Sequence, residues 1–113
     1  MDKVAKYKKI VRQLVAEIGD EGSSSYPEIE TLKVLDDENG QYLLMNSGWR
    51  GERRTYGNFL HVEVKPDGKV WLEHDGTDLE VALMLVERGI PKKDLVLGFQ
   101  APVRRQHSGF AVA

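Results

Sequence analysis

The sequence has 113 residues and no cysteine, and its 16 lysines and arginines nearly balance 18 aspartates and glutamates, for a formal net charge of -2. This length predicts one domain, residues 1–113, and the lack of cysteine excludes disulfides, thiolate zinc sites and thiol nucleophiles. The slightly negative charge argues against a protein that binds mainly by neutralising many phosphates, although local basic patches are compatible with it.

The sequence also lacks membrane and export signals. No apolar run approaches the roughly 20 residues that a membrane span requires. The N-terminus is charged throughout and lacks the continuous apolar stretch of a secretory signal. We therefore expect a cytoplasmic protein without a membrane contact.

The first predicted element is an amphipathic helix from about Asp2 to Ile18. Its apolar residues recur at steps of three and four and so share one face: Val4, Tyr7, Val11, Leu14, Val15 and Ile18. Gly19 follows at the position where a C-terminal helix cap is expected. The basic residues of this segment fall largely off the apolar face, and we interpret them as a solvated surface.

A loop and four strands are predicted next. The segment from Asp20 to Glu28 is rich in turn formers, which favours a loop. The apolar period then changes toward two, and predicts strands at residues 29–35, 41–49, 55–65 and 69–74. Their connections are short, and two of them contain Asn39-Gly40 and Asp67-Gly68, which favour tight turns. Sequential strands with short connections predict an antiparallel meander.

A second helix is predicted from Thr77 onward. The segment Thr77-Asp78-Leu79-Glu80 has the form of a capping box, in which the Thr77 hydroxyl and the Glu80 carboxylate each accept from the other's amide. Gly89 and Pro91 end this helix. Its buried face is expected to contain Leu79, Ala82, Leu85 and Val86. A short helical turn at 91–94, an extended run at 95–99 and an apolar end that packs at 110–113 complete the prediction.

These elements together predict an α+β fold. An antiparallel meander sheet of four to five strands is covered on one face by two main helices, the N-terminal helix and the helix after the His-Asp-Gly-Thr corner. The uncovered face, or an exposed edge strand, favours a homodimer.

One polar corner invites a catalytic or metal-binding interpretation: His74, Asp75, Thr77 and Asp78. A structural role accounts for most of it, since Thr77 and Asp78 suit a helix start and Asp75 suits the turn before it. A catalytic zinc usually needs three protein ligands, and the spacing places neither His61 nor His107 beside His74. We therefore interpret the corner as structural and expect no metal and no other cofactor. An enzyme site at His74 is the weaker alternative.

Other catalytic signatures are also missing from the sequence. There is no glycine-rich phosphate loop with a following lysine, no serine nucleophile elbow and no two-histidine zinc helix. The sequence therefore predicts a protein that is not an enzyme and has no catalytic residues.

Arginines close to aromatic residues form the candidate partner-binding surface. They lie in a predicted hairpin loop and in the tail: Trp49, Arg50, Arg53, Arg54, Tyr56, Arg104 and Arg105. This composition is typical of protein interfaces and of nucleic-acid contacts. Three interpretations stay open at this point, namely a solvated loop, a protein interface and a direct nucleic-acid contact.

Several short segments, in their order and spacing, carry a family resemblance. They are the helix DKVAKYKKIVRQLV, Gly48-Trp49, Arg54 with Tyr56-Gly57, the corner from His74 to Thr77, Arg105 and the terminal FAVA. In this pattern the chain resembles the XisI family, the excision-controlling factors first associated with programmed removal of the fdxN DNA element in cyanobacteria. The resemblance extends over almost the whole chain.

The resemblance implies a small cytoplasmic α+β protein that helps control site-specific excision of a DNA element without being the recombinase. It also implies a XisH-type partner, whose fold resembles restriction-like nucleases, and it carries over no catalytic residues. The near-neutral charge favours contact with that partner or with a recombinase, and makes DNA contact indirect or weak. An antitoxin-like inhibitor of the nuclease-fold partner is the alternative, and a direct DNA-binding regulator is a weaker one.

Overall fold

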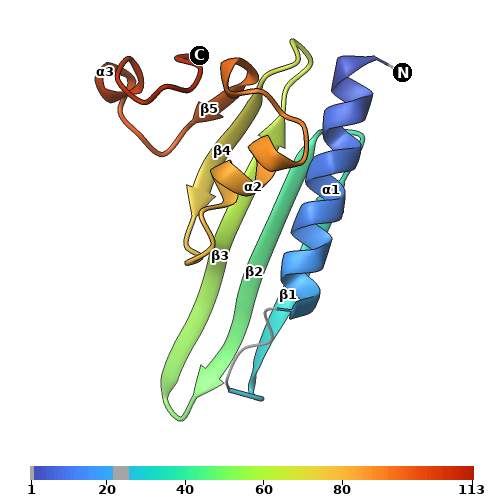
Figure 1. The fold of residues 1–113 in the computed structure, drawn as a ribbon. Helices are drawn as coiled ribbons and strands as arrows, with labels where there is room; N and C mark the ends of the chain where they lie inside the picture. The colour runs from blue at the N-terminus through green and yellow to red at the C-terminus, as the bar shows by residue number, and fades with distance from the viewer. Residues whose placement is uncertain (1, 22–25) are drawn as a thin grey trace.

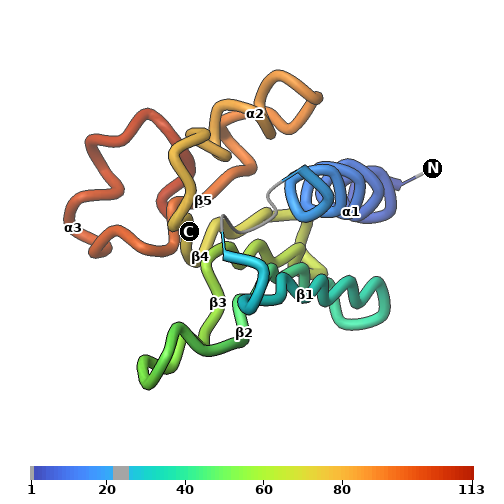
Figure 2. Tube along the Cα trace, turned by 90° about the horizontal axis from the view of Figure 1, so that it is seen from below, coloured from blue at the N-terminus to red at the C-terminus, as the bar shows by residue number. Residues whose placement is uncertain are grey.

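The structure is a computed structural model that describes residues 2–21 and 26–113. Within these residues the chain forms a five-stranded sheet in the order β1-β2-β3-β4-β5, so that each strand lies beside its neighbour in sequence. Helices α1 and α2 both pack on the same face of this sheet (Figures 1 and 2). The predicted α+β fold, with one face covered by two main helices, is confirmed.

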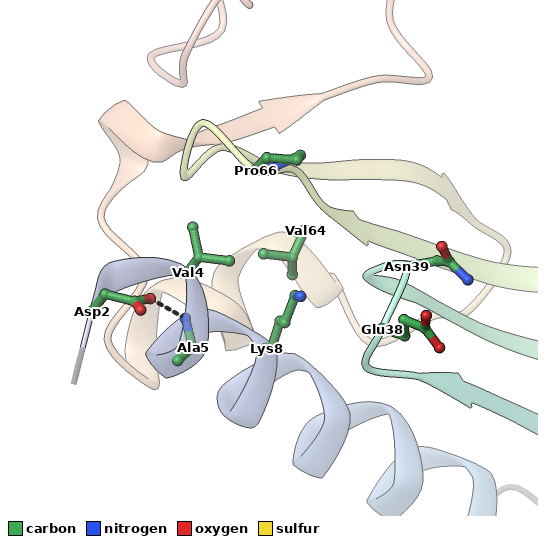
Figure 3. A pocket seen from close by; sticks show the side chains of 8 residues that line it. All are labelled: Asp2, Val4, Ala5, Lys8, Glu38, Asn39, Val64 and Pro66. Carbon is green, nitrogen blue, oxygen red and sulfur yellow. Dashed lines mark hydrogen bonds between the residues drawn. The ribbon is translucent and has the colours of Figure 1, made fainter.

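Helix α1 spans Lys3–Glu21 and begins at a side-chain cap. The Oδ1 of Asp2 accepts a hydrogen bond from the amide of Ala5 at 2.7 Å (Figure 3). The predicted apolar face is confirmed for the residues buried against the sheet: Tyr7, Val11, Leu14, Val15 and Ile18.

The predicted end of this helix at Ile18 is wrong. The helix continues to Glu21, so Gly19 lies inside it instead of capping it. A Cβ at Gly19 would come within 2.8 Å of the Leu44 side chain and 2.9 Å of the Lys33 side chain. A side chain at this position would therefore have to displace Leu44 or Lys33, and glycine suits the close packing of the helix on the sheet. The predicted loop starts later than Asp20, and its residues 22–25 lie outside the described residues.

The four predicted strands are present with small shifts at their ends. They are β1 Ile29–Asp36, β2 Gln41–Arg50, β3 Arg53–Val64 and β4 Val70–Asp75, each antiparallel to the next. Gly40 and Gly68 have φ angles of 66° and 88°, in the region that favours glycine. The tight turns predicted at these two positions are confirmed.

The chain beyond β4 returns along the covered face of the sheet. It forms α2 Val81–Glu87, the short 3-10 helix η1 Lys92–Asp94 and β5 Leu95–Leu97. Because α2 carries the chain back, β5 pairs parallel with β4, and the sheet is antiparallel everywhere else. The tail contains α3 Pro102–Arg105. Phe110 packs against the core and Ala111 bridges to Val96, which confirms the expected packing of the apolar end.

The core lies between the sheet and the two helices. Alternate side chains of the central strands point into it: Tyr42, Leu44, Leu60, Val62, Val64, Val70 and Leu72. The other face is open over β1, where Leu32 and Val34 are 37% and 40% exposed. None of the helices in the described part of the chain combines the length and the apolar character that crossing a bilayer requires.

Candidate partner-binding surface

Strands β2 and β3 extend beyond the rest of the sheet as a two-stranded arm, residues 48–57, which projects past both helices (Figure 1). Pairing of β1 with β2 stops at Gly48, and pairing of β4 with β3 stops at Leu60. Among the described residues, no third strand therefore pairs with residues 49–57, whereas Gly48 at the base of the arm pairs with Ile29. A ribbon of two strands gains little stability from packing, so its side chains are available for other contacts.

The tip of the arm differs from the prediction of a longer arginine loop. The strands reach Arg50 and Arg53, which pair with each other, and only Gly51 and Glu52 form the turn. Gly51 has a φ angle of 60°, as a two-residue hairpin turn requires. The three arginines of the segment consequently lie on paired strands, where the ladder fixes their backbone.

Three side chains form a stack on one face of the arm, and Figure 1 shows this arm free of either helix. Trp49 pairs with Arg54 across the strands, and Tyr56 lies two residues further on the same face. The guanidinium carbon of Arg54 lies 5.3 Å from the centre of the Trp49 ring and 5.0 Å from that of the Tyr56 ring. Trp49 and Tyr56 are 52% and 65% exposed. An arginine is thus held between two aromatic rings that solvent reaches.

The opposite face of the tip carries the other two arginines. Like charges directly opposite each other destabilise a strand pair, yet Arg50 pairs with Arg53. The Arg50 guanidinium lies 3.7 Å from the centre of the Tyr26 ring. Arg50 and Arg53 also line an open pocket together with Glu28 and Gly51. Two cations therefore lie side by side at the tip, and the Tyr26 ring packs against one of them.

The glycine and the tryptophan at the base of the arm have different explanations. A Cβ at Gly48 would come within 2.3 Å of the carbonyl oxygen of Glu28 and 2.7 Å of the Cα of Ile29. Gly48 is therefore required because the start of β1 crosses closely at this point. Trp49 is exposed, so packing does not explain it.

The structure does not bring the two predicted arginine clusters together. Helix α3, with Arg104 and Arg105, lies at the opposite end of the molecule from the arm (Figure 1). The Arg105 guanidinium donates to the carbonyls of Gln100 at 3.1 Å and Gly98 at 3.3 Å, and it lies 5.0 Å from the Trp71 ring centre. Arg105 is thus engaged in holding the tail, whereas Arg104 is exposed.

The polar corner is explained by Asp75, which caps α2 from a distance in sequence. Its Oδ1 accepts from the amide and the hydroxyl of Thr77 at 2.9 and 2.6 Å. Its Oδ2 accepts from the amide of Val81, the first residue of α2, at 3.1 Å. The carboxylate therefore satisfies a helix amide that has no partner within the helix.

The predicted capping box is wrong, because α2 begins at Val81 and not after Thr77. Glu80 precedes the helix with a φ angle of 55°, in the left-handed region, and its side chain makes no capping bond. The Thr77 hydroxyl instead accepts from the amide of Leu79 at 3.2 Å. The later start also shifts the buried face: Leu79 is 50% exposed, and Val81 is buried in its place.

The register of β3 and β4 places His61 opposite His74, a pairing that their separation in sequence does not indicate. His61 Nε2 lies 2.8 Å from Gln41 Oε1, and His74 is exposed. In the part of the chain that the structure describes, no group of three or more histidine, cysteine or acidic side chains could hold a metal ion.

A further pocket lies between the start of α1, the β1–β2 turn and the end of β3 (Figure 3). Its lining residues are Asp2, Val4, Ala5, Lys8, Glu38, Asn39, Val64 and Pro66. None of the residues predicted to form a site is among them, and Asp2 has a structural role there as the cap of α1.

Comparison with protein families matches residues 1–112 to the family described as XisI protein. This chain belongs to the XisI family. The family resemblance inferred from the short segments is thereby confirmed.

Two solved structures of XisI-family proteins from Anabaena variabilis ATCC 29413 are similar to this chain. A XisI-like protein is 38% identical, with 97% of this chain and 99% of that chain covered and a TM-score of 0.90. The fdxN element excision controlling factor XisI is 31% identical, with 99% of this chain and 100% of that chain covered and a TM-score of 0.86. A comparison with curated proteins finds no match.

Proposed function

We propose that this XisI-family protein is a non-enzymatic accessory factor for site-specific excision of a DNA element, and that it acts by binding a protein partner through its arm. The excision role is supported by a relative, 31% identical over 99% of this chain, that is named as the fdxN element excision controlling factor. The observation that carries the binding role is the exposed stack of Arg54 between Trp49 and Tyr56.

The stack suits a protein surface with acidic groups. Tryptophan, tyrosine and arginine are the residues that most often dominate protein interfaces. Because two rings already hold Arg54 in place, binding would order few additional side-chain torsions. The net charge of -2 gives the whole molecule little attraction for the phosphates of DNA. The partner that the family resemblance favours is a XisH-type protein, and a recombinase is the other protein candidate.

The test is co-purification with a XisH-type protein, with wild type compared to a variant carrying Trp49→Ala and Arg54→Ala. Removing an interface hot spot costs about 2 kcal/mol or more, so the Kd should rise by a factor of about 30. Arg104→Ala is the matched control, because it removes an exposed arginine at the opposite end of the molecule and should leave the Kd unchanged.

Three outcomes would change the proposal. A wild-type complex that the arm variant leaves intact would move the interface away from the arm. The absence of a complex, together with salt-sensitive retention of DNA, would support the DNA-binding alternative. A partner nuclease activity that this chain suppresses would support the antitoxin-like alternative.

A further inference from the structure

Strand β1 presents a regular free edge. It spans eight residues, and its pairing with β2 contains no bulge. On its other side no strand is paired with it among the described residues. The opposite edge of the sheet differs, because Ala111 bridges to Val96 of the short strand β5. A long, regular edge with unpaired backbone groups is a template for another chain unless something blocks it.

The sequence features that usually prevent another strand from pairing with an edge strand are mostly absent from β1. Proline and bulges are common blocks, and β1 has neither, since its sequence is IETLKVLD and its register is continuous. A lysine is another, and β1 has one at Lys33. Its ammonium lies 2.5 Å from the Oδ1 of Asp20 on α1, so a neighbouring carboxylate compensates the charge.

We propose that β1 pairs antiparallel with β1 of a second copy of this chain, about a two-fold axis at Leu32. A two-fold contact between identical strands is closed and self-complementary, so it yields a dimer with a continuous sheet of both copies. Residues that lie directly opposite each other in an antiparallel pair point to the same face of the sheet, whereas successive residues of one strand point to opposite faces. The two-fold axis must therefore pass through a residue position and not between two residues. Only a few registers meet this condition.

The charges and apolar side chains of β1 select among these registers. With the axis at Leu32, Ile29 faces the partner subunit's Leu35, and Leu32 faces the same residue of the partner. With the axis at Lys33, two lysines face each other and Glu30 of each copy faces the partner subunit's Asp36, so like charges are opposed at three places. With the axis at Val34, Leu32 faces the partner subunit's Asp36. Of these registers, the one at Leu32 joins the most apolar residues and opposes no like charges.

The residues around β1 also favour pairing with a second copy of this chain. On the face away from α1, Leu32 pairs with Met45 and Val34 pairs with Leu43, which gives a small apolar patch beside the edge. Pairing at Leu32 joins the patches of the two copies across the axis.

On the other face, a groove between the end of α1 and β1 runs along the edge beside Ile29, Thr31 and Lys33. Figure 2 shows α1 above this face, with β1 at the margin of the sheet. In this register the partner subunit's Leu35, which packs against its own core, lies opposite Ile29 at the margin of this groove.

A pair of matched substitutions tests both the interface and its register. Leu32 and Val34 are 37% and 40% exposed on the same face, so lysine at either position has a similar effect on folding. Leu32→Lys would place two lysines opposite each other and should convert the dimer to a monomer. Val34→Lys would face the partner subunit's Glu30 and should leave it dimeric. Sedimentation equilibrium measures the mass of each, and circular dichroism confirms that each is folded.

Cysteine cross-linking provides a second measurement, because the chain has no cysteine of its own. In this register the two Leu32 Cα atoms lie about 5 Å apart, within disulfide reach, whereas the two Val34 Cα atoms lie about 14 Å apart. Under mild oxidation Leu32→Cys should form a covalent dimer and Val34→Cys should not.

A monomeric wild type at micromolar concentration would overturn the dimer. A Leu32→Lys variant that stays dimeric, or cross-linking through Val34→Cys, would overturn the register. Neither result bears on partner binding by the arm, because β1 pairing stops at the base of the arm.

Discussion

Asp75 is the residue on which the polar corner depends. It accepts three hydrogen bonds, two of them from backbone amides, and it links the end of β4 to the first turn of α2. His74, its neighbour, is exposed. The same short segment thus contains one side chain that the fold requires and one that it does not, which the residue types alone do not distinguish.

Substitutions at these two positions should separate structure from chemistry. Asp75→Ala leaves the amides of Thr77 and Val81 without this acceptor, so the free energy of unfolding should fall by about 1–3 kcal/mol. His74→Ala removes an exposed side chain and should change it by less than about 0.5 kcal/mol. Urea unfolding followed by circular dichroism measures both. A folded His74→Ala variant that loses excision control would instead support an enzyme site at the corner, and a fully functional one would exclude it.

At the scale of single elements, two glycines allow close contacts among α1, β1 and β2. Gly19 lets α1 approach β1 and β2 closely, and Gly48 lets the start of β1 approach β2. The pairing of β1 with β2 is continuous between these two contacts and ends at Gly48, where the arm begins. The close approach of β1 at Gly48 thus coincides with the end of the three-stranded part of the sheet.

Gly19→Val should destabilise the protein through this contact. The added side chain would meet Leu44 and Lys33 at distances that require a shift, and overpacking of this kind costs about 1–3 kcal/mol. Gln13→Val is the control, because Gln13 is an exposed position of the same helix and reports the effect of valine on helix formation alone. Thermal unfolding of both variants measures the difference. An equal loss in the two would argue against a packing role for Gly19.

For the molecule as a whole, a polar contact ties α1 to the segment before β5. Asp94 is 4% exposed, accepts a hydrogen bond from the Tyr7 hydroxyl at 2.5 Å and lies 3.1 Å from the Lys3 ammonium. Burial raises the pKa of the Asp94 carboxyl, but the bonds from Tyr7 and Lys3 outweigh it, so the pKa lies below its ordinary value. Burial and the neighbouring carboxylate raise the pKa of Tyr7 to about 12, which keeps its hydroxyl protonated as a donor.

This contact predicts a pH dependence of stability. Because folding lowers the pKa of Asp94, its ionised form stabilises the fold above about pH 4, the ordinary value, and this contribution is lost as the pH falls through the folded pKa. Asp94→Asn removes the titration. Wild type should be more stable than the variant near neutral pH, and the difference should narrow as the pH falls below about 4. Urea unfolding over a pH series measures it, and a constant difference would contradict the role of the charged form.

Periodicity and turn residues were sufficient to predict the two main helices, the four antiparallel strands and the covered sheet, whereas the short helix α3 in the tail was not predicted. The type of each element depends on which face of its segment is buried, and the spacing of apolar residues indicates that face directly. The family could also be recognised from short segments in order, and its model matches residues 1–112.

Long-range contacts account for what the local patterns missed. The capping box failed because Asp75, six residues before Val81, provides the cap, and Glu80 adopts a left-handed conformation. The arginines of the arm and those of the tail were grouped as one candidate surface because of their residue types. In the structure they lie at opposite ends of the molecule, because the strand order and the return of the chain through α2 separate them. The pairing of His61 with His74 and the projection of the arm follow from strand register. Register depends on contacts between segments distant in sequence, and no local pattern of residues records those contacts.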